Sequence, residues 1–362
     1  MTERKPETAL RKGWTTGACA AAAAKAAFRA LIVGEFNKTA QILLPKGQTP
    51  TFDLKQQTLG RTEATASVIK DAGDDPDVTH QAEIAVRVRM AKAGRGVRYF
   101  AGAGVGTVTK PGLPLAVGEP AINAGPRAMI EAAIGDIARE FDCPADVDVT
   151  ISIPGGEELA LKTMNGRLGI VGGLSILGTT GIVIPYSCAS WIHSIHRGVD
   201  VAKAAGISHM AAATGSTSES AVTKLYHLED HALIDMGDFA GGLLKYLRKQ
   251  PIERLTLAGG FGKLSKLAQG HLDLHSSRSQ LDLDELAGRA QAAGADDQLS
   301  QKIRNANTGL EAFAHCQAAG IAIADVMAAG AREVAMATLA GGTEVEVLIF
   351  DRQGQLIGQA DG

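Results

Sequence analysis

The stretch from Ala101 to Ile130 combines glycine, proline and cationic residues in an order that suits an anionic ligand. Three glycines let the backbone approach a ligand with no Cβ in the way: Gly102, Gly104 and Gly106. Pro126 suits the first position of the helix that follows, where its missing N–H costs nothing. Free N–H groups at that helix N-terminus favour an anion, and Lys110 and Arg127 add positive charge. A tight structural connection without a ligand is the alternative interpretation.

A second anion-suited segment begins at Arg11 and leads into an alanine-rich helix that we expect to end at Gly34. Thr15 or Thr16 can cap the N-terminus of this helix with a side-chain hydroxyl. With Arg11 and Lys12 as counter-charges, the helix N-terminus would suit a carboxylate or a phosphate. A capped helix that is simply buried through its alanines is an equally good interpretation.

A third candidate lies in the glycine-rich stretch that ends at Pro185. Its segment Gly178–Gly181 offers backbone N–H groups together with the hydroxyls of Thr179 and Thr180, which again suits an anion. The same residues could equally form a tight crossing between two domains.

The segment Lys70–Thr79 holds four aspartates, among them Asp74 and Asp77. Calcium is a weak interpretation, because the spacing of an EF-hand and its terminal Glu are missing. An active-site turn and a solvated turn that hydrogen-bonds its own backbone are the two better interpretations.

His271, Asp273 and His275 would share one face of an extended segment, with leucines on the other face. Three titratable groups on one face can do acid–base chemistry, and a polar outer strand face is the alternative. Ser279 and Asp282 predict a capping box for the next helix.

Metal chemistry has weaker support in the sequence. His193 and His196 lie three apart on an expected helix, but a zinc site needs a third ligand and usually an acid. The four cysteines are scattered without a C-x-x-C pair, which argues against structural zinc and disulfides and favours a reducing compartment. We therefore predict no metal site.

Several loops in the C-terminal half join a strand to a helix and could bind a nucleoside-like cofactor. The segments Thr214–Glu219 and Gly259–Lys263 lack the spacing of a P-loop and of a G-x-G-x-x-G site. Asp235 and Asp238 stand at the end of a third expected strand, where acidic side chains often hold ribose hydroxyls. The candidate cofactor residues are Thr214, Gly215, Ser216, Glu219, Asp235, Gly237, Asp238, Gly259, Gly260 and Gly262.

These residues need elements that position them, and the hydrophobic pattern changes along the chain. In the first half, alternation predicts strands at residues 40–47, 51–56, 62–71, 82–90, 147–154 and 157–164. Arg87 and Arg89 would share the wet face of an antiparallel sheet, opposite Val86 and Val88. With its helices, this half predicts an α+β domain over residues 1–185.

From residue 186 to 362 helices and strands alternate, which predicts an α/β three-layer, Rossmann-like domain with a mostly parallel sheet. Helices are expected at 187–206, 216–228, 238–250, 263–269 and 311–330. Strands are expected at 208–215, 231–237, 253–260 and 333–342, and a hairpin at 344–358. Strands that end in glycine indicate ligand loops at one edge of the sheet: Gly215, Gly237, Gly259, Gly260, Gly341 and Gly342.

The composition is that of an ordinary globular protein, with 45% hydrophobic and 21% charged residues. The net charge is −3, and the chain has no basic run, so nucleic acid is an unexpected partner. The beginning of the chain has no signal-peptide pattern, and the alanine run that contains Lys25 is too short to span a membrane. We expect a cytoplasmic protein, with a homo-oligomer as one possibility.

The motifs occur together in one order along nearly the whole chain: RKGWTTGACAAAAAKAA, KDAGDDPDVT, GVGTVTKPGL with VGEPAINAGPR, GGLSILGTTGIV, ATGSTSE, MGDF and GHLDLHSSRSQLD. In this the chain resembles the cobalt-precorrin-5B C-1 methyltransferase family of corrin biosynthesis, once called cobalt-precorrin-6A synthase. It departs from the pattern at Ala124 and Tyr186, where we would expect Pro and Met. The family is unrelated in sequence to the other methyltransferases of the pathway, so their motifs do not transfer.

The resemblance implies transfer of the methyl group of S-adenosylmethionine to ring carbon C-1 of a tetrapyrrole that carries many carboxylates. We expect the cofactor in the C-terminal domain and the tetrapyrrole against the N-terminal motifs. The substrate-binding candidates are Arg11, Lys12, Thr15, Thr16, Gly104, Gly106, Lys110, Arg127, Thr179 and Thr180. The candidates for a base are Asp74, Asp77, Glu119 and His275. A tetrapyrrole carrier without activity and a small-molecule kinase are the rival functions.

Overall fold

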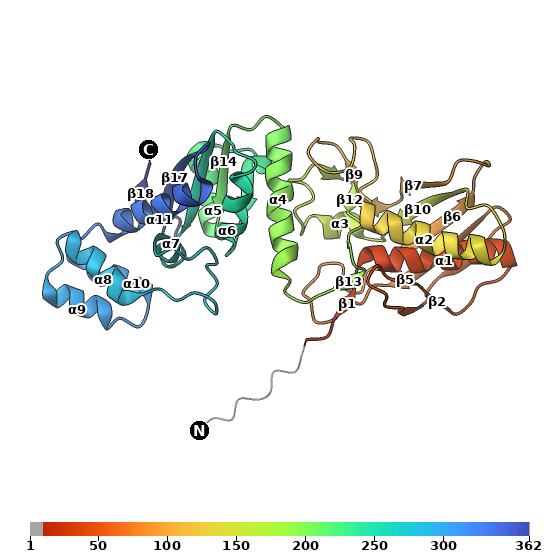
Figure 1. Ribbon diagram of the computed structural model, residues 1–362, viewed down its shortest axis with the longest axis horizontal. Coiled ribbons are helices and arrows are strands. Elements are labelled where there is room, and N and C mark those ends of the chain that lie inside the picture. Colours follow the sequence, from red (N-terminus) through yellow and green to blue (C-terminus); the bar gives the residue numbers. More distant parts are fainter. Residues whose placement is uncertain (1–9, 362) are drawn as a thin grey trace, which may run out of the picture. The chain divides into compact units, whose positions relative to one another are not determined.

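The structure is a computed structural model that describes residues 10–361 (Figure 1). The chain divides into two compact units, Met1–Ser187 and Cys188–Gly362, and each has a hydrophobic core of its own. The architecture is mixed α/β, with a mostly antiparallel sheet in the N-terminal unit and a mostly parallel sheet in the C-terminal unit.

A five-stranded sheet forms the centre of the N-terminal unit, in the order β4-β5-β6-β10-β7. Its strands are β4 (Gln57–Leu59), β5 (Glu63–Ile69), β6 (Glu83–Met90), β7 (Val97–Ala101) and β10 (Val147–Ser152). Strand β7 lies at an edge and runs parallel to β10, whereas the other pairs are antiparallel. Along β6, Val86 and Val88 are buried and Arg87 and Arg89 are exposed, which confirms the expected wet face.

Shorter strands pair around this sheet. Strand β2 (Thr39–Gln41) pairs with β3 (Thr51–Asp53), and β1 (Gly13–Trp14) pairs with β13 (Ile182–Val183). Strand β8 (Gly104–Val105) pairs with β12 (Gly173–Leu174), and β9 (Thr107–Val108) pairs with β11 (Ile170–Val171). The glycine-rich segments are therefore tied together in pairs rather than left as free loops.

Helix α1 (Thr16–Val33) packs against β5 and β6 through its alanines. The Thr15 hydroxyl accepts the N–H of Ala18 at 3.2 Å, and Gly34 ends the helix in the left-handed conformation, so both expected ends are confirmed. This helix is also long and apolar enough to cross a membrane, but 72% of that window is buried within the protein. Its apolar character is therefore accounted for by its place in the core.

Helix α2 (Ala124–Glu140) packs against α1. It begins at Ala124 after Asn123, so the expectation that Pro126 takes the first helical position is wrong. Pro126 is the third residue of the helix, which is tolerated because no N–H in the first turn has an intrahelical acceptor. Its ring is buried against Gly17 of α1.

The strand expected at residues 157–164 is also wrong. Residues Gly156–Ala160 form the short helix α3, which is followed by turns. Glu157 and Glu158 lie in its first turn, where the positive end of the helix dipole stabilises their charge. The alternation of apolar and polar residues there reflects one helical turn rather than a pleated strand.

The C-terminal unit is built on a sheet in the order β15-β14-β16-β17-β18. Its strands are β14 (His209–Ala213), β15 (Leu233–Asp235), β16 (Arg254–Gly260), β17 (Glu344–Phe350) and β18 (Leu356–Ala360). All neighbours are parallel except β17 and β18, which form the expected C-terminal hairpin. After β14 the chain forms β15 on one side of it and later β16 on the other side. The strand order therefore reverses between β14 and β16.

Helices cover both faces of this sheet. Met210 and Ala212 of β14 join one core cluster, and Ala211 and Ala213 join another, with Val222 of α5. The helices are α4 (Cys188–Ala204), α5 (Ser216–Tyr226), α6 (Ala240–Leu247), α7 (Phe261–Ala268), α8 (Leu283–Ala292), α9 (Asp297–Arg304), α10 (Gly309–Ala318) and α11 (Ile323–Leu339), with the 3₁₀ turn η1 (Asp230–Ala232).

Three expectations in this unit are wrong. The segment 333–342 belongs to helix α11, so Gly341 and Gly342 precede strand β17 instead of ending a strand. The helix expected at 311–330 is broken at Gly320, which has φ 71° and separates α10 from α11. Asp282 caps α8 itself by accepting the N–H groups of Asp284 and Glu285, so it is not the third residue of a capping box.

Candidate functional site

The aspartate-rich segment Lys70–Thr79 is fastened to the chain that enters α1. The Arg11 N–H donates to Asp74 Oδ2 at 2.6 Å, and the Asp74 N–H donates to the Arg11 carbonyl at 2.9 Å. The Arg11 guanidinium also donates to Asp71, with 2.9 Å between Nη2 and Oδ1. Hydrogen bonds from Arg11 and from the Gly73 N–H lower the pKa of Asp71 to about 2. The structure therefore brings together Arg11 and Asp74, which the sequence placed in separate motifs.

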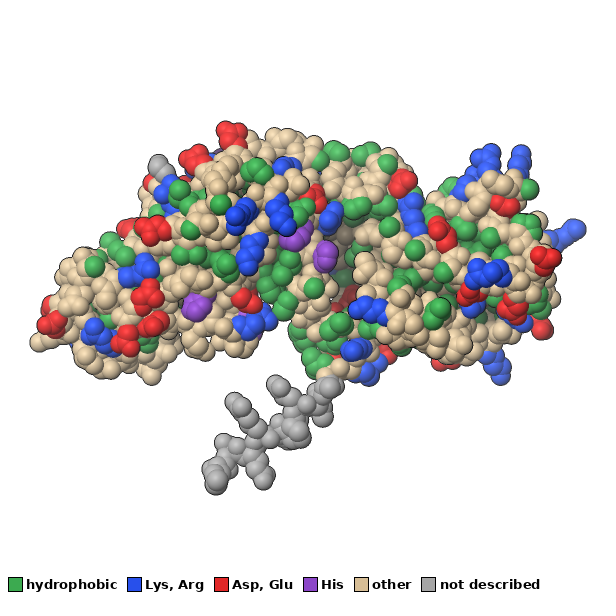
Figure 2. Space-filling model, in the orientation of Figure 1, with side chains coloured by type: hydrophobic (Ala, Val, Ile, Leu, Met, Phe, Trp, Pro, Cys, Tyr) green, Lys and Arg blue, Asp and Glu red, His purple; other side chains and the backbone are tan. Residues whose placement is uncertain are grey.

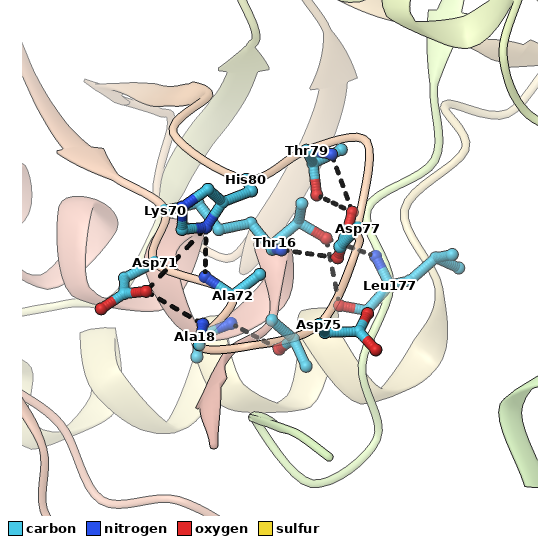
Figure 3. Close-up of polar contacts among 12 residues, drawn as sticks. Thr16, Ala18, Lys70, Asp71, Ala72, Asp75, Asp77, Thr79, His80 and Leu177 are labelled. Carbon is cyan, nitrogen blue, oxygen red and sulfur yellow. Dashed lines mark hydrogen bonds and ion pairs between the residues drawn. The ribbon is translucent and has the colours of Figure 1, made fainter. Parts of the chain in front are cut away.

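Lys70, which is buried, forms an ion pair with Asp77, which is one-quarter exposed, inside this segment (Figure 3). Lys70 is 1% exposed, and its Nζ donates to Asp77 Oδ2 at 2.6 Å. Asp77 Oδ1 accepts both the N–H and the hydroxyl of Thr79. Burial alone would raise the pKa of Asp77, but the charge of Lys70 and these hydrogen bonds together lower it. Both carboxylate oxygens of Asp77 therefore already accept hydrogen bonds, and Asp77 is a weak proton acceptor.

His80 is a residue of this site that the sequence did not single out. Its Nδ1 accepts the Ala72 N–H at 3.1 Å, which assigns the neutral ring as the Nε2–H tautomer (Figure 3). The ring is 40% exposed, and Nδ1 lies 3.9 Å from Asp71 Oδ1. Its position directly after the aspartate motif was the signal that could have found it.

The segment Gly178–Gly181 crosses the N-terminus of α1. The Gly17 N–H donates to the Leu177 carbonyl at 2.9 Å, and the Leu177 N–H donates to the Thr16 hydroxyl at 2.9 Å. A Cβ on Gly178 would lie 2.3 Å from the Thr15 side chain, so only glycine fits there. Donors at this helix end therefore already have protein acceptors, which favours the interpretation of α1 as a capped, buried helix.

The N-terminus of α2 meets the same crossing segment. A Cβ on Gly125 would lie 3.0 Å from the Gly178 carbonyl and 3.0 Å from the Cα of Thr179. A Cβ on Gly17 would lie 2.7 Å from the Pro126 ring. Three motifs that are far apart in sequence thus converge at one place: the entrance to α1, the start of α2 and the Gly178–Gly181 segment. The roles of Lys12, Thr179 and Thr180 in substrate binding stay predictions.

An open cavity of about 530 Å³ lies beside the edge strand β7. Arg127 and Glu119 both line it, and Arg127 Nη2 lies 3.0 Å from Glu119 Oε2. Arg127 is held further by its Nε, which donates to the Ile122 carbonyl at 2.8 Å, and by the Tyr99 ring 5.2 Å below the guanidinium. Two residues that the sequence assigned to substrate binding and to catalysis therefore face one cavity.

Packing accounts for the glycines of the same stretch. A Cβ on Gly104 would lie 1.9 Å from the Ile153 carbonyl, and one on Gly106 would lie 2.4 Å from Ile170. Gly104 also has φ 74° and donates its N–H to Glu157 at 2.6 Å. Lys110 lies along Gly169, where no Cβ would fit beside its stem. These contacts favour the structural interpretation of the glycines and leave the cations of the stretch as the ligand candidates.

In the C-terminal unit, Lys263 ties two of the expected cofactor loops together. Its Nζ donates to the Thr214 carbonyl at 2.8 Å and lies 3.1 Å from Asp238 Oδ1. The Thr214 N–H donates to the Ala258 carbonyl, and the Met236 N–H donates to the Ala213 carbonyl, so the loops after β14, β15 and β16 lie side by side. The expected candidates Thr214, Asp238 and the glycines at the end of β16 are therefore brought to one edge of the sheet.

The glycines of these loops fall into two groups. A Cβ on Gly259 would lie 2.8 Å from Thr214 Oγ1, so packing explains that glycine. Gly237 is explained by its φ of 53°, because a Cβ there would only touch the Trp191 ring at 3.4 Å. Gly215 and Gly262 have open space where a Cβ would be, and Gly260 has only one atom, at 4.0 Å. Gly215 caps α5 without a side chain, and Ser216 begins that helix. The open positions are those where a ligand can approach the backbone.

The segment that contains His271, Asp273 and His275 is irregular rather than a strand. It packs beside the loop after β15, because the Leu274 N–H donates to the Asp238 carbonyl at 2.8 Å. His275 is exposed and lies 2.8 Å from Ser277, whereas Asp273 pairs with Arg278 at 2.6 Å. His275 is thus near the cofactor loops and apart in sequence from the other three candidate bases, which belong to the N-terminal unit.

Among residues 10–361 no group of three metal-ligating side chains occurs. His196 stacks on Tyr246 with 4.0 Å between ring centroids, and burial lowers its pKa. Figure 2 shows acidic and basic side chains interspersed over the displayed face. With a net charge of −3, attraction of an anionic ligand must come from local groups such as Arg127.

Comparison with known proteins extends these observations to the whole chain. A family model described as CbiD matches residues 3–185, and another, described as the CbiD C-terminal domain, matches residues 273–361. Proteins named cobalt-precorrin-5B C(1)-methyltransferase are similar along nearly the full length. The one from Brucella anthropi is 56% identical over 96% of this chain and 95% of its own, and that from Brucella suis is 56% identical over 98% and 97%.

A crystal structure of a cobalamin biosynthesis protein (cbiD) from Archaeoglobus fulgidus is 28% identical to this chain, with a TM-score of 0.41 over 74% of this chain and 83% of that one. The family model that spans half of the sequence and the 56% identity along nearly all of it lead to one conclusion. The chain belongs to the CbiD family, together with proteins named cobalt-precorrin-5B C(1)-methyltransferase.

Proposed function

We propose that this enzyme transfers the methyl group of S-adenosylmethionine to ring carbon C-1 of cobalt-precorrin-5B and so forms cobalt-precorrin-6A. The observation that carries the proposal is the 56% identity to methyltransferases of that name over 96–98% of the chain. The four cysteines are free thiols, which suits the reducing cytoplasm in which we place the enzyme.

The loops of the C-terminal sheet suit the methyl donor. In open α/β sheets, ligands bind outside the carboxyl ends of the strands where the strand order reverses, here between β14 and β16. Gly215 stands at that point with open space around its Cα, and Asp235 follows about 20 residues later at the end of the neighbouring strand. That is the arrangement in which an acid holds ribose hydroxyls, so these residues fit a nucleoside. We place Ser216, Glu219, Gly260 and Gly262 around it.

The N-terminal unit suits the acidic tetrapyrrole. Arg127 offers a guanidinium on the wall of the cavity beside β7, where a substrate carboxylate can replace Glu119 as its partner. The aromatic side chains of Tyr99 and Phe100 line the same cavity and offer apolar contact to a flat ring. Arg11 is partly committed, because it already pairs with Asp71.

The donor supplies an electrophilic methyl carbon: its bond to sulfur breaks while a carbon–carbon bond to C-1 forms, with S-adenosylhomocysteine as the leaving group. The protein's contribution is mostly positioning, which supplies up to about 7–11 kcal/mol in favourable cases. Asp77 is held by Lys70 and Thr79, and Asp74 accepts the Arg11 N–H, so both serve best as structural acids. Glu119, whose side chain is 42% exposed, and the exposed His275 are the candidates that remain.

Calorimetric titration with S-adenosylhomocysteine tests where the donor binds. We expect Asp235→Ala to weaken binding and Arg127→Ala to leave it unchanged. The opposite result would place the donor in the N-terminal unit. Anaerobic incubation with cobalt-precorrin-5B and isotope-labelled S-adenosylmethionine, followed by mass spectrometry, tests the reaction: absence of label in the tetrapyrrole would contradict the proposed activity.

A further inference from the structure

Trp191 lies at the edge of the C-terminal sheet where the loop after β15 begins. It belongs to the first turn of α4, and its indole N–H donates to the Asp235 carbonyl at 3.2 Å. Its ring packs against Gly237, where a Cβ would lie 3.4 Å from the ring atoms. Gly237 has φ 53°, so the loop turns there with no side chain between its backbone and the indole. Both contacts fix the orientation of the ring beside Asp235.

The indole is held in place without being buried. Trp191 is 46% exposed, although Ile195, one turn further along the same helix, is 2% exposed and lies in the core. Phe239 approaches the ring with 6.4 Å between centroids and 47° between planes, so it supports one side only. A tryptophan that is oriented on one side and exposed on the other leaves a large apolar surface for a partner.

Charge and chemistry around the ring select the partner. Asp235 ends β15 beside the ring, and Asp238, in the same loop, lies 3.1 Å from Lys263 Nζ, so the acidic and basic groups there balance and none of them selects an anionic partner. A purine is flat, uncharged and able to stack. The ribose attached to it has hydroxyls that can donate hydrogen bonds to a carboxylate. An exposed indole beside an acid at a strand end therefore matches a nucleoside better than a carboxylate-rich ring.

We propose that Trp191 forms the aromatic wall of the donor site and stacks on the purine of S-adenosylmethionine, while Asp235 holds the ribose. The inference rests on the proposed function, which assigns the donor to the C-terminal unit. It adds a specificity-determining residue that the sequence motifs did not reveal: an aromatic side chain supplied by α4, ahead of the first strand of the sheet. Gly237 takes part indirectly, since its φ of 53° gives the loop the turn that brings its backbone beside the indole.

The chain has only two tryptophans, which makes the proposal directly testable. The other is Trp14 of the N-terminal unit, whose ring packs on Phe52 at 5.7 Å. Trp14→Phe leaves Trp191 as the single indole, and Trp191→Phe leaves Trp14. Each full-length variant is titrated with S-adenosylhomocysteine while tryptophan emission is recorded, and binding is measured in parallel by calorimetry.

We expect the emission of the Trp14→Phe protein to change with the same midpoint as the calorimetric binding curve, and that of Trp191→Phe to stay constant. We expect Trp191→Ala to weaken binding by roughly 5- to 150-fold, the range of one base–aromatic stack, and Trp191→Phe to retain most of the affinity. Circular dichroism of each variant checks that the fold is kept, as the half-exposed position of Trp191 leads us to expect.

The results that would contradict the role of Trp191 differ from those that would contradict the proposed donor site. If Trp191→Ala binds with wild-type affinity, or if Trp14→Phe shows no emission change during calorimetrically detected binding, Trp191 is no part of the site while the donor assignment stands. If the emission change belongs to Trp14 instead, the donor binds in the N-terminal unit and both inferences are wrong. If the wild-type protein binds no S-adenosylhomocysteine, the proposed donor itself is contradicted.

Discussion

The guanidinium of Arg127 and the carboxylate of Glu119 form an ion pair at 3.0 Å on the wall of the cavity beside β7. Arg127 is fixed from three sides, by Glu119, by the Ile122 carbonyl and by the Tyr99 ring. Glu119 is the more exposed partner, with 42% of its side chain exposed against 24% for Arg127. A ligand carboxylate that binds Arg127 must therefore compete with a carboxylate of the protein itself.

This competition gives the first prediction. Glu119→Gln removes the competing charge, so we expect a polycarboxylate tetrapyrrole such as uroporphyrin to bind up to about 5-fold more tightly, as for loss of one exposed ion pair. Arg127→Ala should weaken the same binding. Equilibrium dialysis measures both. Tighter binding with retained turnover identifies Glu119 as a competitor, whereas unchanged binding with lost turnover would identify it as the base.

The second prediction concerns the exposed pair of Arg11 and Asp71. The hydrogen bond from Arg11 lowers the pKa of Asp71 to about 2, below its usual value near 3.8. A carboxyl whose pKa is lowered on folding contributes stability above its unfolded pKa, and this contribution is lost as the pH falls toward the folded pKa. We expect Arg11→Ala to unfold at a lower temperature than wild type at pH 6, and the difference to shrink between pH 4 and pH 2.

Thermal unfolding followed by circular dichroism measures that difference. Arg61→Ala, which removes an exposed arginine outside the motifs, is the control and should shift the midpoint equally little at every pH. A gap between wild type and Arg11→Ala that is constant from pH 6 to pH 2 would show that the ion pair with Asp71 does not contribute.

The sequence predicted an element correctly where the residues at its ends, or the pattern along it, specify that element locally. Thr15 and Gly34 specify the two ends of α1 by local hydrogen bonding and backbone conformation, and the alternation along β6 specifies which side is buried. Strand prediction failed at residues 333–342, where valine and threonine favour a strand locally. There Ala331, Ala335 and Leu339 are buried at helical spacing in α11, so packing of that face decided the structure.

The site was less predictable, because its geometry comes from contacts between distant segments. The cations and acids could be named from their motifs, yet nothing in the spacing of Glu119 and Arg127 shows that Tyr99 of β7 lies under the guanidinium. Likewise, sequence cannot tell a glycine that admits a ligand from one that admits another backbone. Gly104 and Gly215 look alike in sequence, but only Gly215 has open space around it.

The third prediction compares two glycines with positive φ, one packed against another segment and one with open space beside it. Gly73 has φ 69°, and a Cβ there would lie 2.1 Å from the Arg11 carbonyl, whereas Gly47 has φ 87° and open space. Gly47→Ala should cost about 1–2 kcal/mol of unfolding free energy, from backbone strain alone. Gly73→Ala should cost clearly more, because the aspartate segment must also move away from Arg11. Urea unfolding measures both, and equal costs would contradict the close packing of these two segments.

The fourth prediction concerns the buried Lys70 and its partner Asp77. Asp77→Asn leaves the ammonium group of Lys70, 1% exposed, without its ionic partner, so we expect a loss of about 3–5 kcal/mol at pH 7. The double variant Lys70→Met with Asp77→Asn should recover most of that loss, because no charge then remains buried.

The same pair also makes stability depend on pH. Because the pKa of Asp77 is lowered on folding, its contribution to stability is present above pH 4 and disappears in stronger acid. Wild type should therefore lose more stability than Asp77→Asn between pH 5 and pH 3. Urea unfolding at pH 7, 5 and 3 gives all three comparisons, and a loss below about 1 kcal/mol for Asp77→Asn at pH 7 would show that Lys70 finds another partner.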